Sequence, residues 1–163
     1  MLSFQNITIF LTILFSGLVA GLFYAYSCSV NPGLNALNDV EYLKAMQSIN
    51  GAIQNPYFFC SFMGLPLVFP LCYWQTYGSG TSFYLIMEAA IIYFIFVFCI
   101  TIFGNVPLNN MLESFKINEA NNEQIASTRR AFEKPWNQFH LIRTLASVIS
   151  FCLCILSIVA RKS

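Results

Sequence analysis

The sequence predicts an all-α membrane protein in which four transmembrane helices form an antiparallel bundle, organised as one domain over residues 1–163. Composition is the first reason, because 57% of the residues are hydrophobic and only 9% are charged, whereas soluble domains carry roughly 25% charged residues. The distribution of charge is the second. Four long segments carry at most one charged residue each, and each holds the ~20 residues that a helix needs to cross ~30 Å of hydrocarbon. An ordinary soluble enzyme is therefore excluded.

We expect the four spans at about 7–28, 57–76, 82–104 and 141–160. The first is expected to be retained rather than cleaved as a signal peptide, because no basic residue precedes it and its apolar run is too long. Pro66 and Pro70 predict a kink in the second span. Residues 77–81 leave room only for a tight antiparallel hairpin between the second and third spans.

Four spans place both termini on one side of the membrane and two long connections, about 30–56 and 105–140, on the other. In the first connection Asn31-Pro32-Gly33 predicts a turn. Asn38 and Glu41 then have the spacing of a capping box that opens an amphipathic helix. In the second connection, balanced charges favour a short solvated helix, and Pro135 fits the first turn of the helix that becomes the fourth span.

Charge near the membrane gives conflicting indications of orientation. Arg161 and Lys162, which directly follow the fourth span, favour cytoplasmic termini. The long connections hold more basic residues, and the positive-inside rule then favours the reverse. Because the latter residues are spread over long segments, we expect cytoplasmic termini and long connections on the opposite face.

Charge and residue counts exclude several classes of function. A net charge of +1 without a basic run gives no footprint for nucleic acid. The single histidine, His140, excludes a His-rich metal site built from one chain, and we expect no metal site. The six cysteines lie in or beside apolar stretches, where cysteine acts as a small hydrophobe. Cys28 and Cys60 are the one pair worth testing for a disulfide.

Two features of the spans have both a structural and a functional interpretation. Gly17, Gly21, Ala25 and Ser29 recur every four residues, which allows close approach of another helix. Packing within the chain is the expected use, and a homodimer through the Gly17 and Gly21 face is the alternative. Glu88 is the only carboxylate inside a predicted span. Intramembrane carboxylates are candidates for function, although Glu88 lies close enough to the surface to snorkel.

The most informative polar residues lie where the fourth span begins. Trp136, His140, Arg143 and Thr144 share one helix face, and Asn137 borders it. Asn105 and Asn109 lie at the end of the third span, and Asn31 lies at the end of the first, on the same side of the membrane. The structural interpretation is an interfacial anchor with capped helix ends. The functional interpretation is a site that combines an imidazole, a guanidinium and several amides.

These motifs resemble a known family. The run Gly-Asn-Val-Pro-Leu-Asn-Asn at 104–110, followed by Trp136, Asn137, His140 and Arg143-Thr144, is similar to the hallmark of the anthrone oxygenase-like integral membrane family. The early segments Gly17-Leu-Val-Ala-Gly21, Asn31-Pro32-Gly33-Leu34 and Gln54-Asn55-Pro56 resemble the same family. The resemblance covers nearly the whole chain and implies an oxidoreductase that converts anthrones to anthraquinones.

A mechanism for that implied activity needs only the polar residues above. His140 would act as the general base that removes a benzylic proton. Arg143, Trp136, Asn105 and Asn109 would donate hydrogen bonds to the enolate oxygen, and Asn31, Asn137 and Thr144 would complete the binding site. The electron-rich enolate would react with O2 directly, so no tightly bound cofactor is expected. The substrate, a small lipophilic aromatic compound, would enter from the bilayer.

Two other functions remain open at this stage. The first is a non-catalytic membrane scaffold or partner subunit, in which the polar residues only connect helix ends. The second is a haem-binding electron-transfer protein with His140 as one axial ligand. A Soret band would identify the haem protein, and loss of turnover without loss of folding would separate a catalyst from a scaffold.

Overall fold

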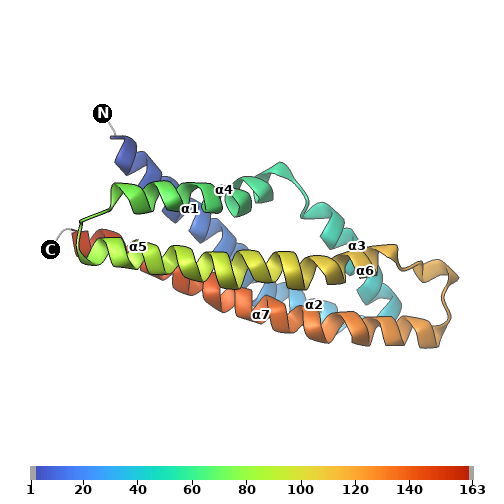
Figure 1. Cartoon of the computed structure of the whole chain (residues 1–163). Helices are drawn as coiled ribbons and strands as arrows, with labels where there is room; N and C mark the ends of the chain where they lie inside the picture. The colour runs from blue at the N-terminus through green and yellow to red at the C-terminus, as the bar shows by residue number, and fades with distance from the viewer. Residues whose placement is uncertain (1–2, 162–163) are drawn as a thin grey trace.

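The computed structural model describes residues 3–161, and this part of the chain contains helices and no strands (Figure 1). Four helices are long and apolar enough to cross a membrane: Phe4–Asn35, Pro56–Gln75, Thr81–Ser114 and Asn122–Ala160. The predicted all-α, four-span fold is thereby confirmed, and each expected span overlaps one of these helices. The two chain ends lie at the same end of the bundle in Figure 1.

Three of the long helices have composite or extended structures. The first consists of α1 (Phe4–Ala25), a π-helical segment (Tyr26–Val30) and α2 (Asn31–Asn35). The third consists of α5 (Thr81–Ile92), the π-helical segments Tyr93–Cys99 and Thr101–Asn105, and α6 (Val106–Ser114). The second is α4 (Pro56–Gln75), and the fourth is α7 (Asn122–Arg161). Between them lie α3 (Asp39–Ala52) and a 3₁₀ turn (Ile117–Glu119).

Local sequence signals set several helix boundaries. The Asn38 side chain accepts a hydrogen bond from the backbone N–H of Glu41 at 3.0 Å, which confirms the predicted start of α3. Asn55 accepts from the N–H of Phe58 at 3.1 Å and starts α4. The turn between α4 and α5 contains Gly78 at φ 80° and Gly80 at φ 62°, a backbone conformation that favours glycine. The tight hairpin between the second and third spans is thus confirmed.

The predicted turn at Asn31-Pro32-Gly33 is wrong, because these residues continue the first long helix as α2. Proline has no N–H to donate and normally interrupts a helix. Here the π-helical segment Tyr26–Val30 ends two residues before Pro32 and accommodates the missing bond with its wider hydrogen-bonding pattern. The same device precedes Pro107, where the segment Thr101–Asn105 leads into α6. The first and third long helices therefore continue into the two predicted connections, as far as Asn35 and Ser114.

The predicted helix start at Pro135 is also wrong. Pro135 lies inside α7, a single 40-residue helix that includes the short helix expected in the second connection. The carbonyl that Pro135 leaves without a helical donor belongs to Ala131, which is exposed and can bind water. Phe132 and Trp136 are buried, and their packing keeps the helix continuous through the proline. Tertiary packing thus overrides the local signal.

Two apolar cores stabilise the structure. One fills the bundle between α1, α4, α5 and α7, and includes Phe23, Phe62, Leu65 and Tyr93. The other lies beyond it, where Leu43 and Met46 of α3 are fully buried against α6 and α7. The amphipathic helix therefore caps the bundle.

The small residues of α1 contribute to packing within the chain. A Cβ atom on Gly17 would lie 3.0 Å from the ring of Phe151 on α7, whereas one on Gly21 would meet nothing within 4 Å. The homodimer through this face stays a prediction. Cys28 and Cys60 are both exposed free thiols in this structure. Lys162 and the side chain of Arg161, on which the expected orientation depends, lie outside the described residues.

Candidate functional site

A cavity of about 450 Å³ lies where α1, α3, α4, α6 and α7 converge. We call it the site cavity. Its volume is within the range of about 300–1,000 Å³ that is typical of small-molecule sites. Most of its lining is aromatic or aliphatic, and the polar exceptions come from α3, the connection that follows it, the third long helix and α7. Its lining includes Phe23, Tyr26, Asn50, Phe58, Phe62, Thr101, Asn109, Asn110, Trp136, His140 and Arg143.

Arg143 places a buried positive charge in the wall of the site cavity. Only 8% of the residue is exposed. Its Nε and Nη2 both donate to Nδ1 of His140 at 3.1 Å, and Nη1 donates to Oγ1 of Thr101 at 3.5 Å. The guanidinium lies 4.4 Å above the ring of Phe23 and 5.2 Å from that of Trp136.

No carboxylate pairs with this charge among residues 3–161, where the ion pairs involve Lys116 and Arg129 instead. A guanidinium has five N–H donors, and the bonds given above use three of them. A buried cation without a counter-charge is costly to keep. The cavity beside Arg143 is therefore suited to an anion or to a group that becomes negative.

His140 is held by a closed set of hydrogen bonds. Because Arg143 can only donate, Nδ1 of His140 must accept, and Nε2 then carries the proton. Nε2 lies 3.0 Å from Oγ of Ser27, which lies 3.1 Å from Oγ1 of Thr144. Oγ1 of Thr144 donates to the carbonyl of His140 at 2.7 Å. A neutral imidazole satisfies every member of this set.

Trp136 forms one side of the site cavity and is fixed at both its ring and its backbone. Its indole stacks on the imidazole of His140, with centroids 5.0 Å apart and planes at 17°. Its Nε1 donates to Oδ1 of Asn109 at 2.8 Å, and its carbonyl accepts from Nδ2 of Asn105 at 3.3 Å. The two asparagines thus connect α6 and the preceding π-helical segment to α7.

The structure brings together some of the predicted site residues. Trp136, His140, Arg143 and Asn109 line the site cavity, and Thr144 and Asn105 support them from behind. Three predicted residues lie elsewhere. They are Asn137, which faces a surface hollow with Lys134 and Gln138; Glu88, which is exposed on the outside of α5; and Asn31, which does not line the cavity.

Sequence reasoning missed several residues of the site. Ser27 and Tyr26 lie in one π-helical segment and Thr101 begins another. A π-helical turn adds one residue, which rotates the following side chains by about 100° relative to a continuous α-helix, so a single helical period does not place them. Asn50 did carry a signal. It follows Leu43 and Met46 on the buried face of α3, is 6% exposed, and its Nδ2 has no hydrogen-bond partner.

Comparison with known proteins gives a match to a protein family. The family model described as anthrone oxygenase matches residues 4–153 of the chain. No curated protein and no solved structure shows a significant match. The matched range includes every residue that lines the site cavity.

Proposed function

The chain belongs to the anthrone oxygenase family, and we propose that it oxidises a flat, lipophilic aromatic compound with O2 in the site cavity. The observation that carries this proposal is the buried guanidinium of Arg143, which faces an aromatic cavity and has no carboxylate partner in the described part of the chain. Such a site binds an enolate better than the neutral compound from which it forms. Preferential binding of the charged species is what accelerates its formation.

The size of this effect follows from Coulomb's law. A unit charge placed 4 Å from the guanidinium is stabilised by about 4 kcal/mol at an effective dielectric constant of about 20. That free energy corresponds to about a thousandfold in rate. Arg143 is held in place before the substrate binds by its two bonds to His140 and one to Thr101. The stabilisation therefore requires little reorganisation during the reaction.

The reaction that we propose balances without a further reductant. Loss of one benzylic proton from the CH2 group gives an enolate, which passes one electron to O2. The resulting carbon radical and superoxide combine to a peroxide anion, which takes up a proton. Loss of the second C–H proton together with hydroxide breaks the O–O bond and gives the ketone. Overall, CH2 and O2 yield C=O and H2O. Because the enolate itself reduces O2, we propose that no tightly bound cofactor takes part.

The hydrogen bonds around His140 favour a positioning role over the predicted role of general base. A proton accepted at Nδ1 would break both bonds from Arg143 and place two cations side by side. A haem iron would likewise have to displace one of the bonds on the imidazole. We propose that His140 holds Arg143, and that the benzylic proton passes to solvent water at the amide-lined side of the cavity, beside Asn109 and Asn110. The general-base role stays a prediction.

The remaining contacts of the substrate follow from the lining of the cavity. The indole N–H of Trp136 is already bonded to Asn109, and its ring already stacks on Phe132 and His140. We therefore assign Trp136 to an apolar edge contact with the flat substrate rather than to donation. Asn50 is the polar residue of α3 that is free to bind a second oxygen on the ring system. A substrate with two oxygen substituents is therefore expected.

The experiment that tests the proposal uses the full chain in liposomes, with anthrone and ¹⁸O2. We expect uptake of one O2 per anthrone and ¹⁸O in the anthraquinone, in protein treated with a chelator and without added flavin or haem. Oxidation no faster than in protein-free liposomes would overturn the proposal and favour a scaffold. A Soret band with turnover that depends on haem would favour the haem protein.

A further inference from the structure

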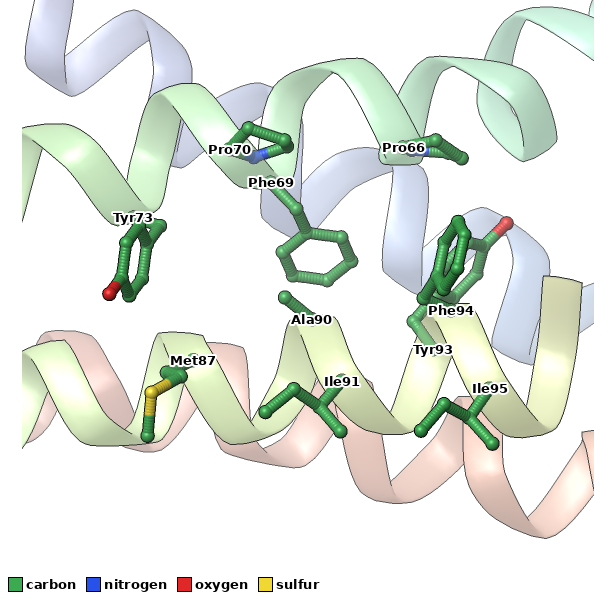
Figure 2. Close-up of a pocket in the computed structure, with 10 residues that line it drawn as sticks. All are labelled: Pro66, Phe69, Pro70, Tyr73, Met87, Ala90, Ile91, Tyr93, Phe94 and Ile95. Atoms are coloured by element: carbon green, nitrogen blue, oxygen red, sulfur yellow. The ribbon is translucent and has the colours of Figure 1, made fainter.

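A second cavity of about 410 Å³ opens on the membrane-facing side of the bundle, between α4 and the helix formed by α5 and the segment Tyr93–Cys99 (Figure 2). We call it the seam cavity. Figure 2 shows Phe69 of α4 directed towards Ala90 of α5 across the hollow. Its outer members Pro70, Ile91 and Phe94 are exposed on two membrane spans. The hollow therefore faces the acyl chains of the bilayer.

A file of stacked aromatic rings leads from the seam cavity to the site cavity. The ring of Phe94, which lines the seam cavity, stacks on Phe98 at 5.5 Å and 13°. Phe98 stacks on Phe62 at 5.6 Å and 21°, and Phe62 stacks on Phe58 at 5.1 Å and 19°. Phe62 and Phe58 both line the site cavity. Nearly parallel rings thus connect the two cavities along one helix seam.

The boundary between the cavities lies where α4 is weakened by proline. Pro66 has no N–H, so the carbonyl of Phe62, four residues earlier, lacks its helical donor. The hydroxyl of Tyr93 donates to this carbonyl at 2.8 Å and is buried. The ring of Phe62 contacts the rings of both Tyr93, at 6.2 Å, and Phe98, at 5.6 Å. Aromatic side chains of α4 and of the segment Tyr93–Cys99 thus meet between the linings of the two cavities.

We propose that the seam cavity is the docking site at which an uncharged, planar fused-ring substrate leaves the bilayer before it passes along the ring file to the site cavity. This inference rests on the proposed function. Two features support it: an apolar lining that suits such a molecule, and a file of stacked rings that runs from the lining of the seam cavity to that of the site cavity. Charged compounds are excluded from this route.

Trp136 allows the test to be made without turnover. The chain has two tryptophans, so Trp74→Phe leaves Trp136 in the wall of the site cavity as the sole indole. In liposomes without O2, stopped-flow quenching of Trp136 by anthrone reports arrival in the site cavity. Ala90→Phe in this background fills the seam cavity, and Leu67→Phe, on the exposed side of α4, is the matched control.

We expect Ala90→Phe to slow quenching at least tenfold while the final amplitude is unchanged, and Leu67→Phe to leave the rate within twofold. Ala90→Leu, a smaller plug, gives an intermediate rate if the larger side chain prevents folding. An unchanged rate in folded Ala90→Phe and Ala90→Leu would overturn the inference, whether or not the parent chain turns over. Quenching without any turnover contradicts the proposed function instead. Absence of quenching in the parent overturns both.

Discussion

Replacement of Arg143 by methionine separates the energetics of folding from those of catalysis. Arg143 is 8% exposed, and its guanidinium is paired with no carboxylate of the described chain. Loss of the cation removes about 4 kcal/mol of enolate stabilisation, so we expect kcat/KM to fall by a factor of about 10²–10³. The same change leaves Nδ1 of His140 without a donor, at a cost of about 1–3 kcal/mol. Relief of burying an unpaired charge offsets that cost.

We therefore expect Arg143→Met to retain or raise the thermal stability of the parent while losing activity. The assay follows oxidation of anthrone by absorbance and O2 consumption in liposomes, and unfolding by circular dichroism. Arg130→Met is the matched control, because Arg130 lies on the same helix but is exposed and outside the site cavity. Activity within tenfold of the parent refutes the electrostatic reasoning. A large loss of thermal stability together with the loss of activity would show that Arg143 stabilises the folded structure rather than the enolate.

Three further predictions concern single contacts. His140→Ala is expected to lower kcat/KM about 100-fold, because the guanidinium of Arg143 loses its position. His140→Asn, which keeps an acceptor for the guanidinium, is expected to restore most of it with an unchanged pH profile, and equal losses would instead favour a general base. Tyr93→Phe leaves the carbonyl of Phe62 without a donor, so thermal unfolding should show a loss of about 1–3 kcal/mol, and an unchanged midpoint contradicts this. A Cβ on Gly64 would lie 2.8 Å from the ring of Phe15, whereas Gly21 has open space. In the same measurement, Gly64→Val should lower the free energy of unfolding by about 1–3 kcal/mol and Gly21→Val should leave it almost unchanged. Similar effects of the two substitutions would disprove the packing argument.

Sequence reasoning was sound where the signal is local or depends on total hydrophobicity. The four spans, the cap at Asn38 and the hairpin at Gly78 and Gly80 all appear in the structure. The predictions of a turn at Pro32 and of a helix start at Pro135 are wrong. At both positions neighbouring π-helical geometry or buried aromatic residues keep the helix intact. A proline indicates the backbone conformation that the isolated chain prefers, and tertiary packing can override that preference.

The candidate site could be predicted only in part, for a related reason. Trp136, His140 and Arg143 share one helical face, and a uniform period of 3.6 residues was enough to group them. Asn137 and Glu88 carry suitable chemistry but face away from the site cavity. Ser27 and Thr101 were missed, because π-helical segments shift the phase of the helices that carry them.

The amino-acid sequence is enough to predict that the chain lies in a membrane and crosses it four times. The reason is that hydrocarbon admits only long apolar segments whose backbone hydrogen bonds are satisfied internally. The tertiary structure decided which polar groups meet. The bond from Arg143 to His140 is local to one helix, but the positions of Thr101, Ser27 and Asn50 around the same cavity depend on how α1, α3 and the third long helix rotate against α7. Helix rotation is set by the packing of whole faces, which no single segment specifies.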